Sequence, residues 1–304
     1  MSKPRVLITG VEGFTGRHLA ARMQGAGYEV HGLSRAPQPV PIAGVDVLHV
    51  CDLTGAEALA QAVHASRPSH VAHLAAISFV PHGDAETIYR TNFLGTRNLL
   101  EALATGRSAL KSVLLASSAN VYGNASQGVL GEDAPTVPAN DYAVSKLAME
   151  HMARLYADQL PVVIARPFNY TGVGQADSFL LPKIVAHVRR RAPAIELGGL
   201  DAARDFSDVR TVVGYYQRLL ETPAAVGGTF NVCSGKAYTV RQVLDLAGRI
   251  SGHTLGVIFN PAFARANEVK LLCGNRSRLD ATVGAMPNIE LEETLQWMLA
   301  AQLT

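Results

Sequence analysis

Charged residues are scarce in this chain of 304 residues, and the two signs nearly cancel. Lys and Arg number 27 against 25 for Asp and Glu, so the formal net charge is +2. Such a balance gives no electrostatic footprint for nucleic acid, because domains that bind nucleic acid carry clustered basic residues. The charged fraction of 17% lies below the roughly 25% of an average soluble domain, which favours a surface partly covered by a second subunit. We therefore expect no nucleic-acid partner.

Long hydrophobic runs and paired cysteines are absent as well. No apolar stretch approaches the roughly 18 residues of a membrane helix, and the first residues carry no signal-peptide pattern. The three cysteines, Cys51, Cys233 and Cys273, are scattered and form no Cys-x-x-Cys motif. Scattered cysteines argue against a disulfide framework or a zinc site and favour a reducing compartment. We expect a cytoplasmic enzyme with no membrane segment and no metal.

Hydrophobic residues make up 48% of the chain, which excludes disorder, and over the first two thirds they follow two alternating patterns. Runs of consecutive Val, Ile and Leu predict strands covered on both faces, at Val6–Thr9, Tyr28–Leu33, Val45–Val50, His70–Leu74, Ser112–Ala116 and Pro161–Ala165. Longer amphipathic stretches between them predict helices, at Thr15–Ala26, Glu57–Ser66, Ala85–Ala104 and Tyr142–Asp158. Strands that alternate with helices predict a parallel sheet built from βαβ units.

The alternation fades after residue 170, where only Val240–Ile250 and Leu291–Ala301 stand out as helices. The sequence thus predicts an α/β fold, with a Rossmann-type doubly wound parallel sheet and a smaller C-terminal α/β substrate domain. We expect the first domain to cover residues 1–170 and the second to cover residues 171–304. We also expect part of the segment 205–235 to return to the large sheet.

Glycines recur at every third position directly after the first predicted strand, at Gly10, Gly13 and Gly16. A glycine permits a tight turn and lets backbone N–H groups approach a pyrophosphate, which then lies at the positive end of a helix dipole. Glycines also mark ordinary turns, but a position between the first strand and the first helix favours a phosphate-binding loop. We expect this loop, with Phe14 and Thr15, to bind a dinucleotide.

The end of the second predicted strand discriminates between the two nicotinamide cofactors. NAD enzymes usually place Asp or Glu there, on the ribose hydroxyls, whereas NADP enzymes place an arginine near the 2′-phosphate. This strand ends in Ser34-Arg35, and both side chains are able to donate to a phosphate. Asp52 and Leu53 follow the third strand, where Asp52 fits the adenine region and the start of the next helix equally well. The missing carboxylate favours NADP(H).

A tyrosine and a lysine, Tyr142 and Lys146, lie four residues apart at the start of a predicted helix. At this spacing they share one helix face, and a nearby ammonium is expected to lower the pKa of the phenol from its ordinary value of about 10. Such a tyrosine is a usable acid or base. Ser117 and Ser118 follow the fifth strand, at the carboxyl edge where open α/β sheets bind ligands. A surface pair and a turn-capping serine are the alternative interpretations.

Seven sequence motifs, which include the glycine loop and the Tyr142–Lys146 pair, together span nearly the whole chain. They are Thr9–Gly16, His73–Ala76, Asn92 with Gly95-Thr96, Ser117–Gly123, Tyr142 with Lys146, Arg166–Gln175 and Arg204–Val209. In this combination the chain resembles the extended short-chain dehydrogenase/reductase family, whose members mostly act on nucleotide-linked sugars. It departs from the family at Val173 and Ala266, where the family carries proline.

The resemblance implies roles for individual residues. It implies a catalytic set of Ser118, Tyr142 and Lys146, and the last two are also expected to hold the cofactor. The loop after the fourth strand, with Leu74, Ala75 and Ala76, is expected to contact the cofactor as well. The residues expected to contact the substrate are Ser78, Ser118, Asn169, Lys183, Arg204, Arg265 and Glu268. Among them, the arginines would hold a diphosphate, since arginine suits charge-assisted contacts with phosphate.

The residues that follow Ser118 narrow the reaction. The dehydratases of this family carry Thr-Asp-Glu or a close variant where this chain has Ser118-Ala119-Asn120, and neither Ala nor Asn exchanges protons usefully. Ketone reduction and 4-epimerisation remain. The segments Arg204–Val209, Phe230–Gly235 and Glu268-Val269 are most similar to GDP-4-dehydro-6-deoxy-D-mannose reductases. The resemblance therefore implies NADPH-dependent reduction of the C4 ketone of a nucleotide-linked 4-keto-6-deoxyhexose, with GDP as the favoured nucleotide and GDP-D-rhamnose as the product.

Three alternatives stay open: a nucleotide-sugar 4-epimerase, a reductase that forms GDP-6-deoxytalose, and a non-catalytic NADP-binding sensor or scaffold on the same fold. The family also commonly pairs two helices across a dimer, here Ala85–Ala104 and Tyr142–Asp158. We therefore expect a homodimer held together by a four-helix bundle.

Overall fold

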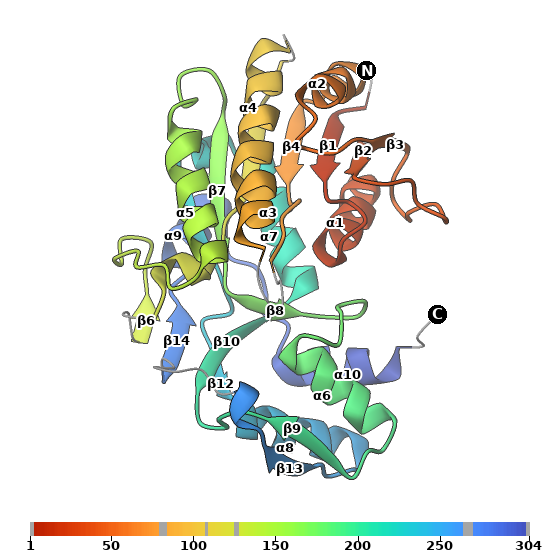
Figure 1. The fold of residues 1–304 in the computed structure, drawn as a ribbon, viewed down its shortest axis with the longest axis vertical. Coiled ribbons are helices and arrows are strands. Elements are labelled where there is room, and N and C mark those ends of the chain that lie inside the picture. Colours follow the sequence, from red (N-terminus) through yellow and green to blue (C-terminus); the bar gives the residue numbers. More distant parts are fainter. Residues whose placement is uncertain (1–2, 79–83, 107–108, 125–127, 264–269, 302–304) are drawn as a thin grey trace.

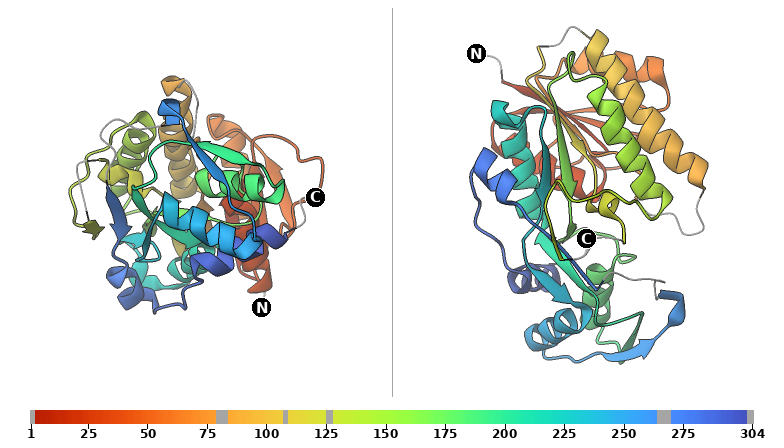
Figure 2. Two further views of the ribbon diagram at one scale, coloured as in Figure 1. Left: turned by 90° about the horizontal axis from the view of Figure 1, so that it is seen from below. Right: turned by 90° about the vertical axis from the view of Figure 1, so that its left-hand side faces the viewer.

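The computed structural model describes residues 3–78, 84–106, 109–124, 128–263 and 270–301. A large α/β part lies on one side of the molecule and a smaller part lies beyond the carboxyl ends of its strands (Figures 1 and 2). Within the described residues, the large part holds a seven-stranded sheet whose neighbouring strands all run parallel. Its spatial order is β11 (Thr229–Val232), β7 (Val162–Pro167), β5 (Ser112–Ala116), β4 (His70–His73), β1 (Arg5–Thr9), β2 (Glu29–Ser34) and β3 (Val47–Val50).

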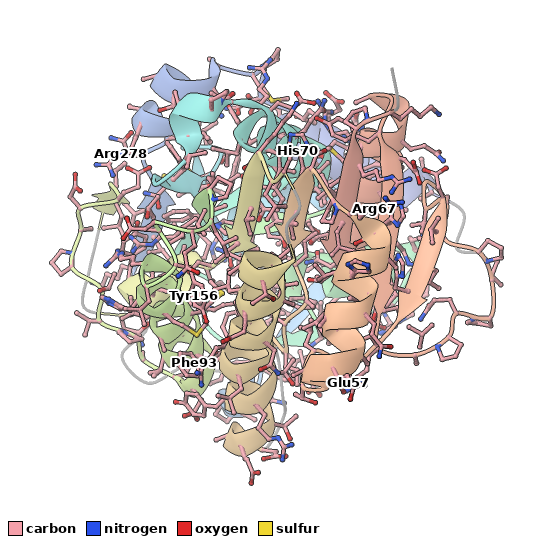
Figure 3. The ribbon with its side chains drawn as sticks, turned by 90° about the horizontal axis from the view of Figure 1, so that it is seen from above. Glu57, Arg67, His70, Phe93, Tyr156 and Arg278 are labelled. Carbon is pink, nitrogen blue, oxygen red and sulfur yellow. The ribbon has the colours of Figure 1, made fainter. Side chains whose placement is uncertain are left out.

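Helices cover both faces of this sheet, as its consecutive apolar residues require. One face carries α1 (Phe14–Gly25) and α7 (Val209–Glu221), with α9 (Ser277–Val283) beside α7. The other carries α2 (Ala56–Ser66), α4 (Thr96–Thr105) and α5 (Asp141–Arg154). Seen from above, the layer of α2, α4 and α5 bears Glu57, Phe93 and Tyr156, and α7 and α9 lie across the sheet (Figure 3). The predicted doubly wound parallel sheet is therefore confirmed.

The smaller part has its own hydrophobic core between three helices, α6 (Leu180–Arg189), α8 (Val240–Ser251) and α10 (Leu291–Ala300). A parallel pair, β9 (Ala194–Leu197) and β13 (Gly256–Phe259), lies at its outer end (Figure 1). A mixed sheet joins it to the large part and contains β12 (Ala237–Thr239), β10 (Ala203–Asp208), β14 (Leu271–Gly274) and β6 (Gly128–Leu130), with β8 (Asn169–Thr171) pairing with β10. The described short turns are η2 (Ala119–Tyr122), η3 (Pro223–Ala225) and η4 (Pro261–Phe263).

The helix expected over Ala85–Ala104 is present without a break, but its winding changes along its length. It consists of α3 (Ala85–Tyr89), a π-helical segment η1 (Arg90–Gly95) and α4. Such segments are rare and often mark functional sites. Asn92, in this segment, is 1% exposed and points inward to hydrogen-bond partners on other elements. The sequence pattern shows the amphipathic period but not this local change of winding.

The chain passes between the two parts several times. After β10 in the mixed sheet, it re-enters the large part as α7 and β11, and β11 pairs with β7 from Thr229 to Val232. It then goes back to β12 and α8. The two parts therefore share backbone crossings, and a boundary at residue 170 separates only some of the elements. None of the described helices is long and apolar enough to cross a bilayer.

The order of the strands fixes where a ligand binds. From β1 the chain builds outward to β2 and β3, and it then returns to add β4 on the other side of β1. In open parallel sheets, the crevice for a ligand lies at such a reversal, beyond the carboxyl ends of the strands. The loops that follow β1 and β4 meet there, and they contain the glycine motif and Leu74–Ser78.

Candidate active site

A cavity of about 540 Å³ occupies this crevice, between the large sheet and the smaller part. Its walls come from the glycine loop, the loop after β4, the end of β5 with η2, the start of α5, the segment around β8 and the start of α6, with one residue each from β10 (Phe206) and β14 (Leu272). The expected residues that line it are Gly10, Gly13, Phe14, Thr15, Gly16, Leu74, Ala76, Ser78, Ser118, Tyr142, Lys146 and Asn169. The fold thus brings the glycine motif and the residues expected to be catalytic to one cavity.

The glycine loop has no room for side chains at two positions. Gly10 has a φ of +66°, and a Cβ there would lie 2.8 Å from the Cα of Ala75. A Cβ on Gly16 would overlap the carbonyl oxygen of Gly10. Gly13 forms the N-cap of α1 without a side-chain hydrogen bond, and the first turn of α1 contains no acid. This bare helix N-terminus fits the pyrophosphate of a dinucleotide.

The three side chains expected to be catalytic converge from the segment after β5 and from α5. The hydroxyl of Tyr142 is hydrogen-bonded to the side chain of Ser118. Ser118 Oγ also accepts a hydrogen bond of 3.1 Å from the backbone N–H of Asn120, which fixes its orientation. Lys146 Nζ donates to the carbonyl oxygen of Ala116 at 2.6 Å and lies 6.0 Å from the centroid of the Tyr142 ring. The short segment from Ala116 to Ser118 therefore bonds both Tyr142 and Lys146.

The pKa values of this pair differ from the expectation. Burial, together with the nearby Tyr170, raises the pKa of Tyr142 to about 12. Burial lowers the pKa of Lys146 to about 8, and the charge of Glu150 opposes that shift. Burial therefore outweighs the lowering of the phenol pKa expected from Lys146, whose ammonium is bonded to the Ala116 carbonyl rather than to the phenol. At neutral pH Tyr142 therefore holds its proton, which is the state that a proton donor needs.

Asn92 joins the loop after β4 to α5. Its Oδ1 accepts from the Ile77 N–H at 2.8 Å, and its Nδ2 donates to the Ile77 carbonyl at 3.0 Å. The same Nδ2 donates to Ser145 Oγ at 3.1 Å, between Tyr142 and Lys146 on α5. The π-helical winding of η1 places this side chain inward, so one amide fixes both walls of the cavity.

A second cavity, of about 290 Å³, continues from the glycine loop towards the end of β2. The expected residues that line it are Gly10, Gly13, Arg35, Asp52, Leu53, Leu74, Ala75 and Ala76. Ser34 does not line it: its hydroxyl is buried and donates to the Ala36 carbonyl at 2.7 Å, which corrects its expected role as a phosphate donor. Asp52 accepts from the Thr54 N–H at 2.8 Å before α2 begins and also faces this cavity.

Glu12 is a residue of the second cavity that the sequence analysis missed. It lies between Gly10 and Gly13, and its Oε2 is buried without a hydrogen-bond partner. The sequence did offer a signal, which is an acidic residue inside the glycine motif. The motif specifies only the glycines, however, and accepts any residue at that position. Tyr170 and Phe179 in the larger cavity were missed too, because nothing in the sequence relates β8 and the start of α6 to the glycine loop.

The remaining expected substrate contacts lie elsewhere. Lys183 donates to the Glu196 carbonyl at 2.8 Å and covers the ring of Phe263, and Arg204 donates to the Ala203 carbonyl at 2.9 Å. Neither side chain lines the larger cavity. Arg265 and Glu268 lie outside the described residues. The described part of the chain holds no cluster of His, Cys, Asp or Glu able to bind a metal ion.

A dinucleotide-binding loop at a strand reversal, next to a tyrosine, lysine and serine set, defines an oxidoreductase of the short-chain dehydrogenase/reductase type. The sequence pattern of the family described as GDP-mannose 4,6 dehydratase matches residues 7–298. The chain belongs to this family.

Named relatives cover nearly the whole chain. The chain is 34% identical to GDP-6-deoxy-D-mannose reductase of Pseudomonas aeruginosa, over 97% of this chain and 96% of the relative. It is 32% identical to GDP-6-deoxy-D-talose 4-dehydrogenase of Aggregatibacter actinomycetemcomitans, over 92% of this chain and 91% of the relative.

Solved structures show the same fold. A candidate epimerase from Burkholderia cenocepacia superposes with a TM-score of 0.93 at 50% identity, over 98% of both chains. The RMD protein of Pseudomonas aeruginosa, in complex with NADPH, superposes with a TM-score of 0.84 at 31% identity, also over 98% of both chains.

Proposed function

We propose that the protein reduces the C4 ketone of GDP-4-dehydro-6-deoxy-D-mannose with NADPH and releases GDP-D-rhamnose. One observation carries the reductase assignment: among the described residues that line the larger cavity, the titratable side chains are Tyr142, Tyr170 and Lys146 alone. No carboxylic acid and no histidine of that set is available to remove a proton and a hydroxyl. Dehydration needs such groups, whereas ketone reduction needs one proton donor.

The site residues divide the work of this reaction. When bound, a reduced nicotinamide supplies the hydride that adds to C4. Tyr142 gives its phenolic proton to the carbonyl oxygen, and Ser118, which is hydrogen-bonded to that phenol, orients the same oxygen. Lys146 stabilises the tyrosinate that results, because its ammonium lies on the same face of α5. The protein thus contributes alignment and charge, which is where enzymes of this kind obtain much of their rate.

Two features of the second cavity support NADPH as the reductant. Arg35 faces the cavity at the end of β2, and no acid stands at that strand end. The relative RMD binds NADPH at 31% identity. Glu12 acts against a 2′-phosphate, because its carboxylate lines the same space. The preference for NADPH is therefore a balance between Arg35 and Glu12.

We assign the binding of the substrate diphosphate to arginine side chains. Among the described residues, the candidate is Arg204. This side chain is half-buried on β10, close to the cavity wall formed by Phe206 of the same strand. A diphosphate is held alike in ground state and transition state. Arg204→Ala should therefore raise the KM for the nucleotide sugar about 10-fold or more and change kcat little, as measured by steady-state NADPH consumption. A fall in kcat with an unchanged KM would contradict this role.

The proposal is tested by incubating the protein with NADPH and a panel of nucleotide-linked 4-keto-6-deoxyhexoses and identifying the sugar product. Stoichiometric NADPH consumption with GDP-D-rhamnose as product supports it. GDP-6-deoxy-D-talose as product would assign the opposite face of the ketone, in line with the relative from Aggregatibacter. Interconversion of 4-epimers without net NADPH consumption would instead assign a 4-epimerase; the structural neighbour from Burkholderia is described as a candidate epimerase.

A further inference from the structure

A buried ion pair lies directly behind the catalytic set. Glu150 and Arg166 are 0% and 4% exposed, and they meet in a two-point contact, with Nη2–Oε2 at 2.6 Å and Nε–Oε1 at 2.9 Å. Glu150 stands on α5 one turn after Lys146, and Arg166 stands on β7. A buried pair of this kind adds little stability by itself, because desolvation offsets the attraction. The position of the pair, next to Tyr142 and Lys146, points to a role in the site rather than in stability.

The pair is tied to the segment that holds the catalytic side chains. Ser117 Oγ donates to Glu150 Oε1, and the neighbours of Ser117 on either side are the contacts of Lys146 and Tyr142. Ala116 accepts from the Lys146 ammonium, and Ser118 bonds the Tyr142 hydroxyl. Glu150 thus pins the end of β5 against α5 at the point between these two contacts.

Arg166 is satisfied on its other side as well. Its Nη1 donates to Tyr122 Oη at 3.0 Å and to the Glu132 carbonyl at 3.1 Å. Tyr122 in turn donates to Asn231 Oδ1 at 2.7 Å. The guanidinium is therefore fixed by η2 and by the end of β11, and it holds the carboxylate in one place. A carboxylate fixed in this way is a preorganised negative charge behind Lys146.

The titratable and charged side chains around the Tyr142–Lys146 pair, among the described residues, are Tyr142 and Glu150 on α5, His73 on β4, Arg166 on β7, Tyr170 on β8 and Tyr216 on α7. Burial, together with Lys146, lowers the pKa of His73 to about 3, so this ring is uncharged. The charged residues of the other elements packed on α5 are exposed, as Glu86, Arg90 and Glu101 are. Glu150 is the negative charge that acts on Lys146.

We propose that Glu150 is a positioning residue of the reductase, which keeps the Lys146 ammonium charged and, through Ser117 and Arg166, sets the distance between α5 and the end of β5. Burial works against the charge of Lys146, and Glu150 offsets part of that effect. An uncharged Lys146 would no longer stabilise tyrosinate, so activity is lost as pH rises through the pKa of Lys146. Without Glu150 that loss begins at lower pH.

The first test needs no substrate, so it is independent of the proposed reaction. The chain has six lysines, and their 13Cε signals are followed by NMR during a pH titration after labelling, with Lys146 assigned from Lys146→Met. In Glu150→Gln, which keeps the shape of the side chain, we expect the Lys146 midpoint to fall by about one pH unit. An unchanged midpoint would overturn the proposal, and wild-type activity on any substrate has no bearing on this result.

Asp208→Asn is the matched control. Asp208 is also buried, also meets an arginine at two points (Arg210, 2.7 and 3.0 Å), and also accepts from a hydroxyl, that of Thr294 at 2.8 Å, but it does not line the larger cavity. This variant should lose stability without a change in the Lys146 midpoint. A fall like that of Glu150→Gln would show that the shift reports general loosening, and the proposal would fail.

Two further variants keep the test decisive. If Glu150→Gln does not fold because Arg166 is left uncompensated, the double variant Glu150→Gln/Arg166→Met removes both charges, and its Lys146 midpoint should still lie below that of wild type. Ser117→Ala removes the tie to β5 but leaves the charge. It should lower kcat several-fold with the alkaline limb of the pH profile unmoved, and a wild-type kcat would overturn the distance-setting part of the proposal.

Discussion

Tyr142 is the residue on which the proposed chemistry depends most directly. Tyr142→Phe keeps the ring but removes the phenolic proton, so kcat should fall by about 10²–10⁴-fold, the usual contribution of general acid catalysis. The dissociation constant of NADPH should change little, and it can be measured by fluorescence titration. As a control, Tyr28→Phe removes a hydroxyl that binds Glu221 at the C-terminal end of α7, away from both cavities, and it should keep the wild-type kcat. A Tyr142→Phe enzyme as fast as wild type would refute the mechanism.

The choice between NADPH and NADH rests on two opposite charges in one small cavity. Arg35→Asp should shift the ratio of the two dissociation constants towards NADH, and Glu12→Gln should shift it towards NADPH, because each changes the charge that a 2′-phosphate meets. Both ratios come from equilibrium titrations with the two cofactors. Shifts in the same direction would mean that one of the two side chains does not face the ribose.

Single residues could be predicted from the sequence where they belong to a local motif. They could not be predicted where their contacts depend on how the fold buries them. Tyr142, Lys146 and the glycines could be predicted because their spacing is itself the requirement of the chemistry. Ser34 was wrong because a short turn lets its hydroxyl bond Ala36 instead of a ligand. Glu150 carries no local pattern at all, since its partner Arg166 lies 16 residues away on a strand.

Among the elements, η1 offers the sharpest test, because one inward amide links two walls of the cavity. Asn92→Ala leaves the Ile77 N–H and C=O without their side-chain partner; a fully buried group left in this way costs about 1–3 kcal/mol, and these partly buried ones cost less. We expect a lower melting temperature and a several-fold higher KM for NADPH. In the control Asn288→Ala, the lost bonds are those with the Ser234 carbonyl and the Arg276 guanidinium, neither of which lines a cavity described above, and stability alone should fall. Equal KM effects in both variants would contradict the role of Asn92.

The inner strands of the first half were predictable because their burial is uniform, whereas β3, at the edge of the sheet, was expected to be covered on both faces and is partly exposed. β5 was predicted with its observed bounds, Ser112–Ala116, since both faces are covered and the residues are consecutively apolar. α7 was missed, although it is the central helix of one face of the sheet. It follows directly on the strand β10 at Asp208, without a glycine or proline to mark the change, and Thr211 and two tyrosines are buried with its apolar residues. Strands of three residues, such as β6 and β8, are too short for any period to show.

The whole molecule is expected to be a homodimer through the outer layer of η1, α4 and α5 (Figures 1 and 3). Apolar side chains are exposed on this layer: Leu94 by 45%, Val144 by 38% and Leu155 by 78%. Burial of these side chains against a second copy would remove them from water. Light scattering at micromolar concentration should give twice the chain mass, and Leu94→Arg with Val144→Arg should give the single mass. A monomeric wild type would refute this interface.

The return of the chain through α7 to β11 has a consequence for synthesis on the ribosome. When residue 170 leaves the exit tunnel, β7 is an edge with unpaired backbone groups, and the face later covered by α7 is open apolar surface. The strand that closes this edge, β11, is made some 60 residues later, a few seconds at ordinary elongation rates. During that interval the nascent sheet exposes an unpaired edge and an apolar face, which are the surfaces that nascent-chain chaperones bind. A gene fragment that stops at residue 170 should therefore yield aggregates rather than a small cofactor-binding domain.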